Sequence, residues 1–429
     1  MRVNVVCVGM MLVTSGALAA PQKPPADESP LGQFVVTGRS AEHITSLGIL
    51  PSNSSAFEDV IVRNVVRRDL ELSGMFRILS ESKAPPGVYG FRDPVDVDAW
   101  QAAGAEVVVK VGAQSKGDNV EILGLAYFLS TGKEPVFEKR VAVEKKDARK
   151  AAHRITDALL GAITGRPGGF ASQFVFSKRW GKNPRVLVMD ADGHGLKPVT
   201  EVADTAIAPA WGPGHDLFYG LSRRYSPFRL FRGTGSAAKA VRLPVSGNVY
   251  GVAFDKDRKR MAVALGSVEG SAVYVGMADG GELKRVSTTP IATHPVFSPS
   301  GKVAWIGGGD RRQPQRVWVE GKPVSPSGFS AAAPTFCDTE DGIRMVYAVA
   351  VRGDKQDLVM SGERGQGVVR LTQQQGTNSY PACSSDGRLL AFFSTRRSGE
   401  GLYMMNMKRW KTTKVSGTIG ESLRWAPVP

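Results

Sequence analysis

One short pattern recurs from residue 170 to the end of this 429-residue chain. Each copy has an apolar run, a turn rich in Pro, Gly, Ser or Asp, and a second apolar run, as in THPVFSPSGKVAWI at residues 293–306. The first run of each copy ends on one of six anchor residues, which are Trp211, Phe254, Phe297, Phe336, Cys383 and Trp425. Successive anchors are 39 to 47 residues apart. A period of about 40–45 residues with several short strands per unit is typical of a β-propeller.

The two ends of this repeat region complement each other. Each repeat continues with further short apolar segments, which predict four strands per unit. Residues 174–199 lack an inner strand, whereas the chain ends on SLRWAP at residues 422–427, an inner strand without outer partners. Pairing the two would complete a blade and remove the exposed edges of an open ring. We therefore expect a six-bladed β-propeller over residues 170–429, closed by the C-terminal strand.

Residues 33–165 have a different pattern. Apolar residues recur at helical spacing after SAFE at residues 55–58, which has the form of a capping box, and again over residues 147–163. Short apolar segments between them predict strands. We expect a small α/β domain in front of the propeller, and thus an α+β multidomain chain. His153, on the second helix, is expected to be a surface or packing residue rather than a ligand.

The first residues predict export. Arg2, a short apolar run and Ala17-Leu18-Ala19 have the form of a secretory signal peptide over residues 1–19. The run is too short to be a permanent membrane helix, and no later run is long enough. The Pro-rich residues 20–32 predict an extended, exposed arm. We expect a soluble exported protein without a transmembrane segment.

Cysteine and charge say less about function. Only Cys337 and Cys383 follow the signal peptide, and they are one position out of step in neighbouring repeats. On strands such a step points the two side chains to opposite faces, so we expect them to be unbridged, although an oxidising compartment would permit a bridge. The net charge of +15 is spread over short basic patches, which predicts a solvated surface.

Several local motifs resemble the TolB family, the periplasmic propeller proteins of the Tol–Pal system of Gram-negative bacteria. They are LGILP at residues 47–51, RDLELSGMF at 68–76, TGRPGGF at 164–170, the Ser-Pro-x-Gly turns and WAP at 425–427. The resemblance covers nearly the whole chain after the signal peptide. One departure is Ser300, which stands where the family turn usually has Asp.

The resemblance implies a non-enzymatic periplasmic scaffold that supports outer-membrane integrity and cell division. Such proteins bind the peptidoglycan-associated lipoprotein Pal at one mouth of the propeller channel and the inner-membrane-anchored protein TolA through their N-terminal segment. In this chain the Pal-like contacts are expected just before the inner strands, at Asn248, Tyr250, Gly251, Thr293, His294, Asn378, Tyr380 and Glu421. The TolA-like contacts are expected at Gln33, Phe34, Val35 and Val36.

No catalytic residue, metal or cofactor is expected, and the chain alone is expected to be monomeric. Export argues against nucleic acid as a partner. A propeller-gated peptidase would need a Gly-x-Ser-x-Gly elbow followed by an acid and a His, and the sequence has no complete match. The positive charge leaves open a propeller that binds anionic envelope glycans. Trp211, Phe254 and Phe297 would be its stacking residues, but their place in the repeat predicts core positions.

Overall fold

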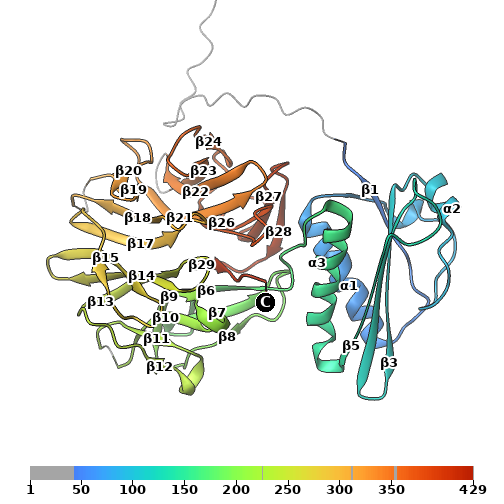
Figure 1. Cartoon of the computed structure of the whole chain (residues 1–429), viewed down its shortest axis with the longest axis horizontal. Coiled ribbons are helices and arrows are strands. Elements are labelled where there is room, and N and C mark those ends of the chain that lie inside the picture. The colour runs from blue at the N-terminus through green and yellow to red at the C-terminus, as the bar shows by residue number, and fades with distance from the viewer. Residues whose placement is uncertain (1–42, 225, 311–312, 352–354, 429) are drawn as a thin grey trace, which may run out of the picture.

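The computed structural model describes residues 43–428, apart from residues 225, 311–312 and 352–354. The predicted signal peptide and the Pro-rich arm lie outside the described residues. The described chain forms a mixed sheet with helices, followed by a ring of six sheets (Figure 1). Within these ranges no helix has the length and apolar character needed to cross a membrane. The expected fold class, an α/β domain followed by a six-bladed propeller, is confirmed.

The N-terminal part is a five-stranded sheet in the order β2-β1-β3-β4-β5. Strand β1 is parallel to β2 and β3, and β3, β4 and β5 are antiparallel neighbours. Its elements are β1 (Ser46–Ile49), α1 (Phe57–Ser73), β2 (Arg77–Ile78), η1 (Glu81–Lys83), α2 (Val97–Ala102), β3 (Val107–Lys116), β4 (Asn119–Phe128), β5 (Phe137–Glu144), η2 (Lys145–Asp147) and α3 (Ala148–Thr164).

The alternation of side chains along β3 explains why the first residues of this strand are consecutive valines. Val107 and Val109 belong to the apolar core that includes residues of α1 and α3. Val108 belongs to a second core with Trp100 of α2. Because successive residues of a strand point to opposite faces, a segment covered on both faces favours a continuous apolar run, as at residues 107–109.

The ends of α1 differ in how well the sequence predicts them. Gly74 ends the helix in the left-handed conformation at φ 59°, as expected for a C-terminal glycine. The predicted capping box is wrong, because Ala56 is the N-cap residue and no side chain caps the helix there. Phe57, the first residue of α1, is 74% exposed and does not contribute to its apolar face.

The propeller consists of six four-stranded antiparallel sheets, with the innermost strand of each blade beside that of the next. Five blades are continuous in sequence, and each starts with its inner strand. They contain β9 (Thr205–Trp211), β10 (Leu217–Ser222), β11 (Arg229–Arg232) and β12 (Lys239–Ala240); β13 (Asn248–Phe254), β14 (Arg260–Ser267), β15 (Gly270–Met277) and β16 (Lys284–Arg285); β17 (Ile291–Phe297), β18 (Val303–Gly308), β19 (Arg316–Val319) and β20 (Lys322–Pro323); β21 (Ala331–Thr339), β22 (Gly342–Ala350), β23 (Gln356–Gly362) and β24 (Val369–Arg370); and β25 (Asn378–Cys383), β26 (Leu389–Ser394), β27 (Gly401–Asn406) and β28 (Thr412–Ser416).

The sixth blade joins both ends of the propeller sequence. Its strands are β29 (Glu421–Trp425), β6 (Gln173–Trp180), β7 (Asn183–Asp190) and β8 (Lys197–Pro198), in that order. Strand β29 is antiparallel to β6, with Trp425 opposite Phe174. Their rings are 4.6 Å apart, and the Trp425 indole N–H donates to the Ser172 hydroxyl at 2.8 Å. The predicted closure by the C-terminal strand is therefore confirmed.

Replacing Trp425 by Ala is expected to lower the free energy of unfolding by ~3–5 kcal/mol, because a large buried aromatic side chain is lost from the closing strand. The measurement is denaturant unfolding followed by intrinsic fluorescence and circular dichroism. Trp180→Ala is the matched control, since Trp180 lies on the partner strand and is 40% exposed. Equal stability of the two variants would contradict closure through β29.

The expectation of free thiols is wrong, because Cys337 and Cys383 form a disulfide with their Cα atoms 5.4 Å apart. Cys337 lies on β21 and Cys383 on β25, the inner strands of neighbouring blades. The sheets of a propeller pack face against face, so one face of a blade meets the opposite face of the next. Two side chains one position out of step point to opposite faces of their sheets. Because opposite faces of neighbouring blades meet, Cys337 and Cys383 therefore point toward each other.

Reduction of the disulfide is expected to lower the free energy of unfolding by ~2–4 kcal/mol, because the bond closes a loop with a sequence separation of 46 residues. The comparison is denaturant unfolding with and without a reducing agent. A Cys337→Ala/Cys383→Ala variant should have the stability of the reduced wild type, both with and without the reducing agent. A wild-type protein that does not respond to the reducing agent, with both thiols titratable beforehand, would contradict the bond.

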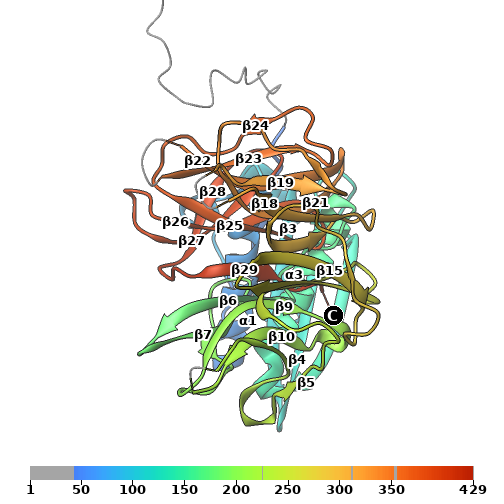
Figure 2. The ribbon, with the colours of Figure 1, turned by 90° about the vertical axis from the view of Figure 1, so that its left-hand side faces the viewer.

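Helices α1 and α3 lie between the N-terminal sheet and the propeller (Figures 1 and 2). A single apolar core runs from these helices into the sixth and fifth blades, including Phe174 and Phe393. The propeller also supplies hydrogen-bond donors to the carboxyl ends of both helices. Asn406 donates its amide N–H to the Ser73 carbonyl at 2.9 Å, and Arg409 donates to the Gly74 carbonyl at 3.1 Å.

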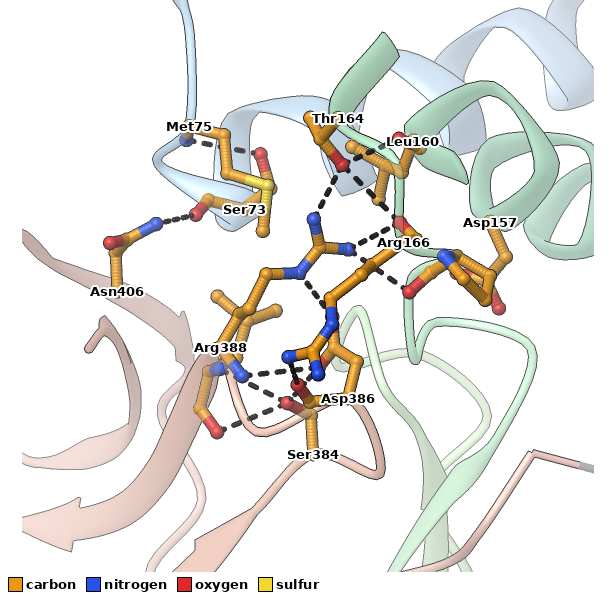
Figure 3. A network of polar contacts seen from close by, with 12 residues as sticks. Ser73, Met75, Asp157, Leu160, Thr164, Arg166, Ser384, Asp386, Arg388 and Asn406 are labelled. Carbon is orange, nitrogen blue, oxygen red and sulfur yellow. Dashed lines mark hydrogen bonds and ion pairs between the residues drawn. The ribbon is translucent and has the colours of Figure 1, made fainter. Parts of the chain in front are cut away.

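Arg388 makes the corresponding contact at the end of α3 (Figure 3). Its guanidinium donates to the Thr164 hydroxyl at 2.5 Å and to the carbonyls of Arg166 at 2.8 Å and Pro167 at 3.0 Å. Asp386 accepts from the Nε of Arg388 at 2.5 Å and holds the side chain in place. The carbonyls of Arg166 and Pro167 lie just beyond the end of α3, so the donors of Arg388 join this segment to the propeller.

His153 is buried in the same contact. Its Nδ1 donates to the Asp69 carboxylate of α1 at 2.8 Å, and its Nε2 lies 4.0 Å from Asp192, which follows β7 in the propeller. Burial alone would lower the pKa of His153, but the charge and hydrogen bond of Asp69, with the charge of Asp192, raise it above 6.5. Of the two expected roles, surface or packing, the structure shows a buried packing residue, which joins helices α1 and α3 to the propeller.

Stability is expected to fall as the pH rises from 6 to 9. A histidine whose folded pKa is raised contributes fully below its unfolded pKa, about 6.5, and loses that contribution as the pH rises through the folded pKa. The thermal midpoint of His153→Gln should change less across this range than that of the wild type. His215→Gln, at an exposed histidine, is the control and should follow the wild type. Parallel curves for wild type and His153→Gln would contradict this role.

Candidate functional site

Every inner strand of the propeller carries a register shift at the same place. In five strands the shifts lie between Val249 and Gly251, Thr293 and Val296, Ala332 and Thr335, Ser379 and Ala382, and Glu421 and Arg424. In β9 the shift lies opposite Phe218 to Gly220 of β10. Five of the residues at these bulges have φ between 46° and 54°, namely Ala208, His294, Ala333, Tyr380 and Ser422. We call these five residues, with Tyr250 of β13, the bulge ring.

The bulge ring has a local cause in the sequence. In four inner strands the residue after the bulge residue is proline, as in His294-Pro295 and Tyr380-Pro381. Proline has no N–H to donate to the ladder, so within a sheet it is found at edges and bulges. A bulge re-aims the side chain of the extra residue. A left-handed conformation at a residue other than glycine costs of order 1 kcal/mol or more, which is typical of functional positions.

Three of the predicted mouth residues belong to this ring. Tyr250 is 40% exposed. His294 and Tyr380 are half-buried. Burial, with the charge of Glu421, raises the pKa of Tyr380 to about 12. Sequence reasoning missed Ala208, Ala333 and Ser422. The repeated X-Pro pair before the anchor was the signal that pointed to the first two.

The other predicted residues surround the ring. Thr293 lies beside His294, with their Oγ1 and Nδ1 atoms 3.1 Å apart. A Cβ on Gly251 would lie 2.8 Å from the Pro295 ring, so only glycine lets these neighbouring strands approach so closely. Glu421 is exposed at the start of β29.

Two predicted asparagines bond within the propeller. Asn378 is fully buried, accepts from the Ser394 hydroxyl at 2.8 Å and donates to the Gln356 carbonyl at 3.3 Å. Asn248 is half-buried and accepts from the backbone N–H of Phe228 at 2.9 Å. These side chains hold the loops that lead into the inner strands. Gln33, Phe34, Val35 and Val36 lie outside the described residues.

His294 and Arg424 lie on inner strands at opposite sides of the ring. Strands β17 and β29 are three blades apart, on opposite sides of a six-bladed ring. Burial, with the positive charge of Arg424 on β29, lowers the pKa of His294 on β17 to about 4. His294 is therefore neutral at pH 7.

The described residues of the N-terminal domain contact the other end of the propeller. The inner strand β25 runs from the mouth to the turn that contains Asp386 and Arg388, and that turn contacts the end of α3. The contact thus lies at the opposite end of the strand from Tyr380. The anchors Trp211, Phe254 and Phe297 pack at the edges of the apolar clusters between blades, as expected for core positions.

The buried residues at the domain contact include three with potential metal-ligand atoms within 4.8 Å of one another, Asp69, His153 and Asp192. They are far apart in sequence, so spacing alone does not reveal them. Arg149 already pairs with Asp192, while His153 pairs with Asp69. The arrangement is that of a buried ion-pair network, in which the arginine and the imidazolium supply the positive charge.

Known proteins resemble this chain in both parts. The family model of the TolB amino-terminal domain matches residues 39–123. The "Tol-Pal system protein TolB" of Geobacter sulfurreducens is 30% identical over 189 residues, which cover 42% of this chain and 43% of that protein. The protein of the same name from Anaeromyxobacter dehalogenans is 26% identical over 294 residues, covering 66% of this chain and 64% of that protein. The chain is thus similar in sequence to TolB proteins over part of its length.

A solved structure agrees with the TolB fold over both parts of the chain. The crystal structure of TolB from Acinetobacter baumannii superposes with a TM-score of 0.74 at 20% identity, covering 90% of this chain and 97% of that one. At this identity the likeness supports the fold. In sequence, the chain spans 36% to 47% of the length of the first curated TolB relatives that it matches.

Proposed function

We propose that this chain is a TolB-family protein and a non-enzymatic component of a periplasmic Tol–Pal system, exported by residues 1–19 and built from domains at residues 33–165 and 170–429. Its propeller binds a Pal-like lipoprotein at the mouth formed by the bulge ring. The observation that supports this most is the ring itself, because five of the six inner strands place a residue with positive φ at the same end of the propeller. The names of the curated relatives support the Tol–Pal assignment.

The architecture suits binding to a folded partner. The ring residues lie on strands held by neighbouring blades on both sides, so little ordering cost arises on association. Tyr250 supplies an exposed aromatic side chain, a residue type enriched at the energetic centre of interfaces. The contact surface we propose includes Tyr250, Gly251, Thr293, His294, Tyr380 and Glu421.

We propose a second contact for the N-terminal segment. Gln33, Phe34, Val35 and Val36 would engage a TolA-like protein by adding an extended strand to a sheet edge of that partner. Main-chain hydrogen bonds would supply much of the affinity, and the alternating side chains the specificity. The protein would then connect an outer-membrane-associated lipoprotein with an inner-membrane-anchored protein.

Calorimetric titration with the periplasmic domain of Pal from the same organism tests the first contact. Tight binding to the wild type is expected, with a loss of at least 2 kcal/mol of binding free energy in Tyr250→Ala/His294→Ala, as is typical of interface hot spots. Met277→Ala is the control. Met277 is 49% exposed on the same blade as Tyr250, at the end of the blade away from the ring.

The outcomes separate function from site. Tight binding that is unchanged in the double variant would contradict the proposed contact surface and leave the Pal-binding function standing. An absence of binding in a protein whose circular dichroism shows it to be folded would contradict the function itself. Anionic envelope glycans would then be the next ligand class to titrate.

A further inference from the structure

The hairpin between β6 and β7 lies beside the bulge ring, at the mouth end of the sixth blade. Glu421, which directly precedes the ring residue Ser422, is paired with Ser177 of β6. Strand β6 continues from Ser177 to Trp180, three residues further, whereas β26 of the fifth blade ends one residue beyond the partner of Ser379. At about 3.3 Å per residue, the hairpin extends about 10 Å past this part of the ring and forms a raised edge of the mouth.

Two exposed apolar side chains lie at this edge. Trp180, the last residue of β6, is 40% exposed, and Val202, in the loop between β8 and β9, is 74% exposed. Asn183 connects the two segments, because it is paired with Trp180 across the hairpin and its side-chain amide donates to the Ala203 carbonyl at 3.5 Å. The two apolar residues thus belong to one continuous surface, which leads into the inner strand β9.

Basic side chains surround these apolar residues. Arg179 and Lys182 are exposed in the hairpin, and the Arg179 guanidinium donates to the Lys182 carbonyl at 2.8 Å. In the next blade, Arg223 pairs with Asp204 at 3.5 Å. This ion pair joins the hairpin of the first blade to the loop that contains Val202, and it neutralises the Asp204 carboxylate.

We call the five exposed residues of this surface the rim patch, which consists of Arg179, Trp180, Lys182, Val202 and Arg224. Its three positive charges exceed the one exposed carboxylate in the same loops, that of Glu201. Tryptophan and arginine are residue types enriched at the energetic centres of protein interfaces. The neighbouring ring members Ser422 and Ala208 have short side chains, so the rim patch supplies large contact residues on this side of the mouth.

We propose that the rim patch is a second contact for the protein partner that binds the bulge ring, and that the facing surface of this partner is acidic around an apolar residue. The inference rests on the proposed function and adds the chemistry of the partner's surface on one side of the mouth. A folded partner on the ring lies against the raised hairpin, and its acidic residues complement the basic ones of the patch.

The first test is calorimetric titration of the full mature protein with the periplasmic domain of Pal from the same organism. Trp180→Ala is expected to weaken binding about 30-fold, as is typical when an aromatic hot-spot residue is truncated. Met277→Ala removes an exposed apolar side chain at the other end of the second blade and should match the wild type. Circular dichroism verifies that both variants are folded.

Charge reversal tests the acidic character of the partner's surface, and it decides the matter even where Trp180→Ala does not fold. Arg179→Glu/Lys182→Glu alters exposed side chains only. Its association rate, measured by stopped-flow fluorescence at low salt, is expected to be about tenfold below that of the wild type, and the difference should shrink at high ionic strength. Lys259→Glu/Lys284→Glu, at exposed positions on the opposite end of the second blade, should change the rate far less.

Each other outcome overturns the inference. Unchanged affinity of a folded Trp180→Ala, or an unchanged or faster association rate of the charge-reversed variant, would do so and leave the proposed function intact. A folded wild type that does not bind would overturn both. Co-sedimentation with vesicles of phosphatidylglycerol and phosphatidylethanolamine tests a membrane surface instead. Trp180-dependent binding to these vesicles, with unchanged affinity for the Pal domain, would assign the rim patch to lipid.

Discussion

The antiparallel pairing of β29 with β6 is the interaction on which the rest of this structure depends. It joins the last strand of the chain to the first strand of the propeller and so removes both free edges of the ring. It also places Trp425 in the core shared with α1 and α3. One strand thus closes the ring and supports the contact with the N-terminal part.

Ring closure also brings the β-bulges of the six inner strands together at one end of the propeller. A single bulge in one strand only bends that strand, but six equivalent bulges around a closed ring direct their residues to one mouth. The repeat keeps the backbone the same while the side chains vary, from Ala208 to His294 to Tyr380. The rigid part of the site is therefore set by the fold, and its chemistry by a few positions within the repeat.

The parts of this architecture that follow from periodicity were predictable from sequence. The spacing of the anchors predicted the number of blades, and the unpaired ends of the repeat predicted closure. Features that depend on how neighbouring sheets face each other could not be predicted from the sequence. The disulfide between Cys337 and Cys383 arises because opposite faces of neighbouring blades meet, and alignment of the repeats alone suggests the reverse. The contacts of His153 and Arg388 join residues far apart in the chain, and no local pattern reveals them. The bulge ring could be predicted only in part, because X-Pro pairs mark several of its members but not Tyr250 or Ser422.

The central claim, that a protein partner binds at the bulge ring of the closed propeller, is tested most directly by amide hydrogen exchange with and without the periplasmic domain of Pal. The account predicts slower exchange on binding at the starts of the inner strands, around residues 248–251, 291–294, 378–380 and 421–422. It predicts unchanged exchange at the turns around residues 298–301 and 384–387, at the other end of the blades. Protection of those turns, or of the outer strands, with no change at the ring would contradict the claim.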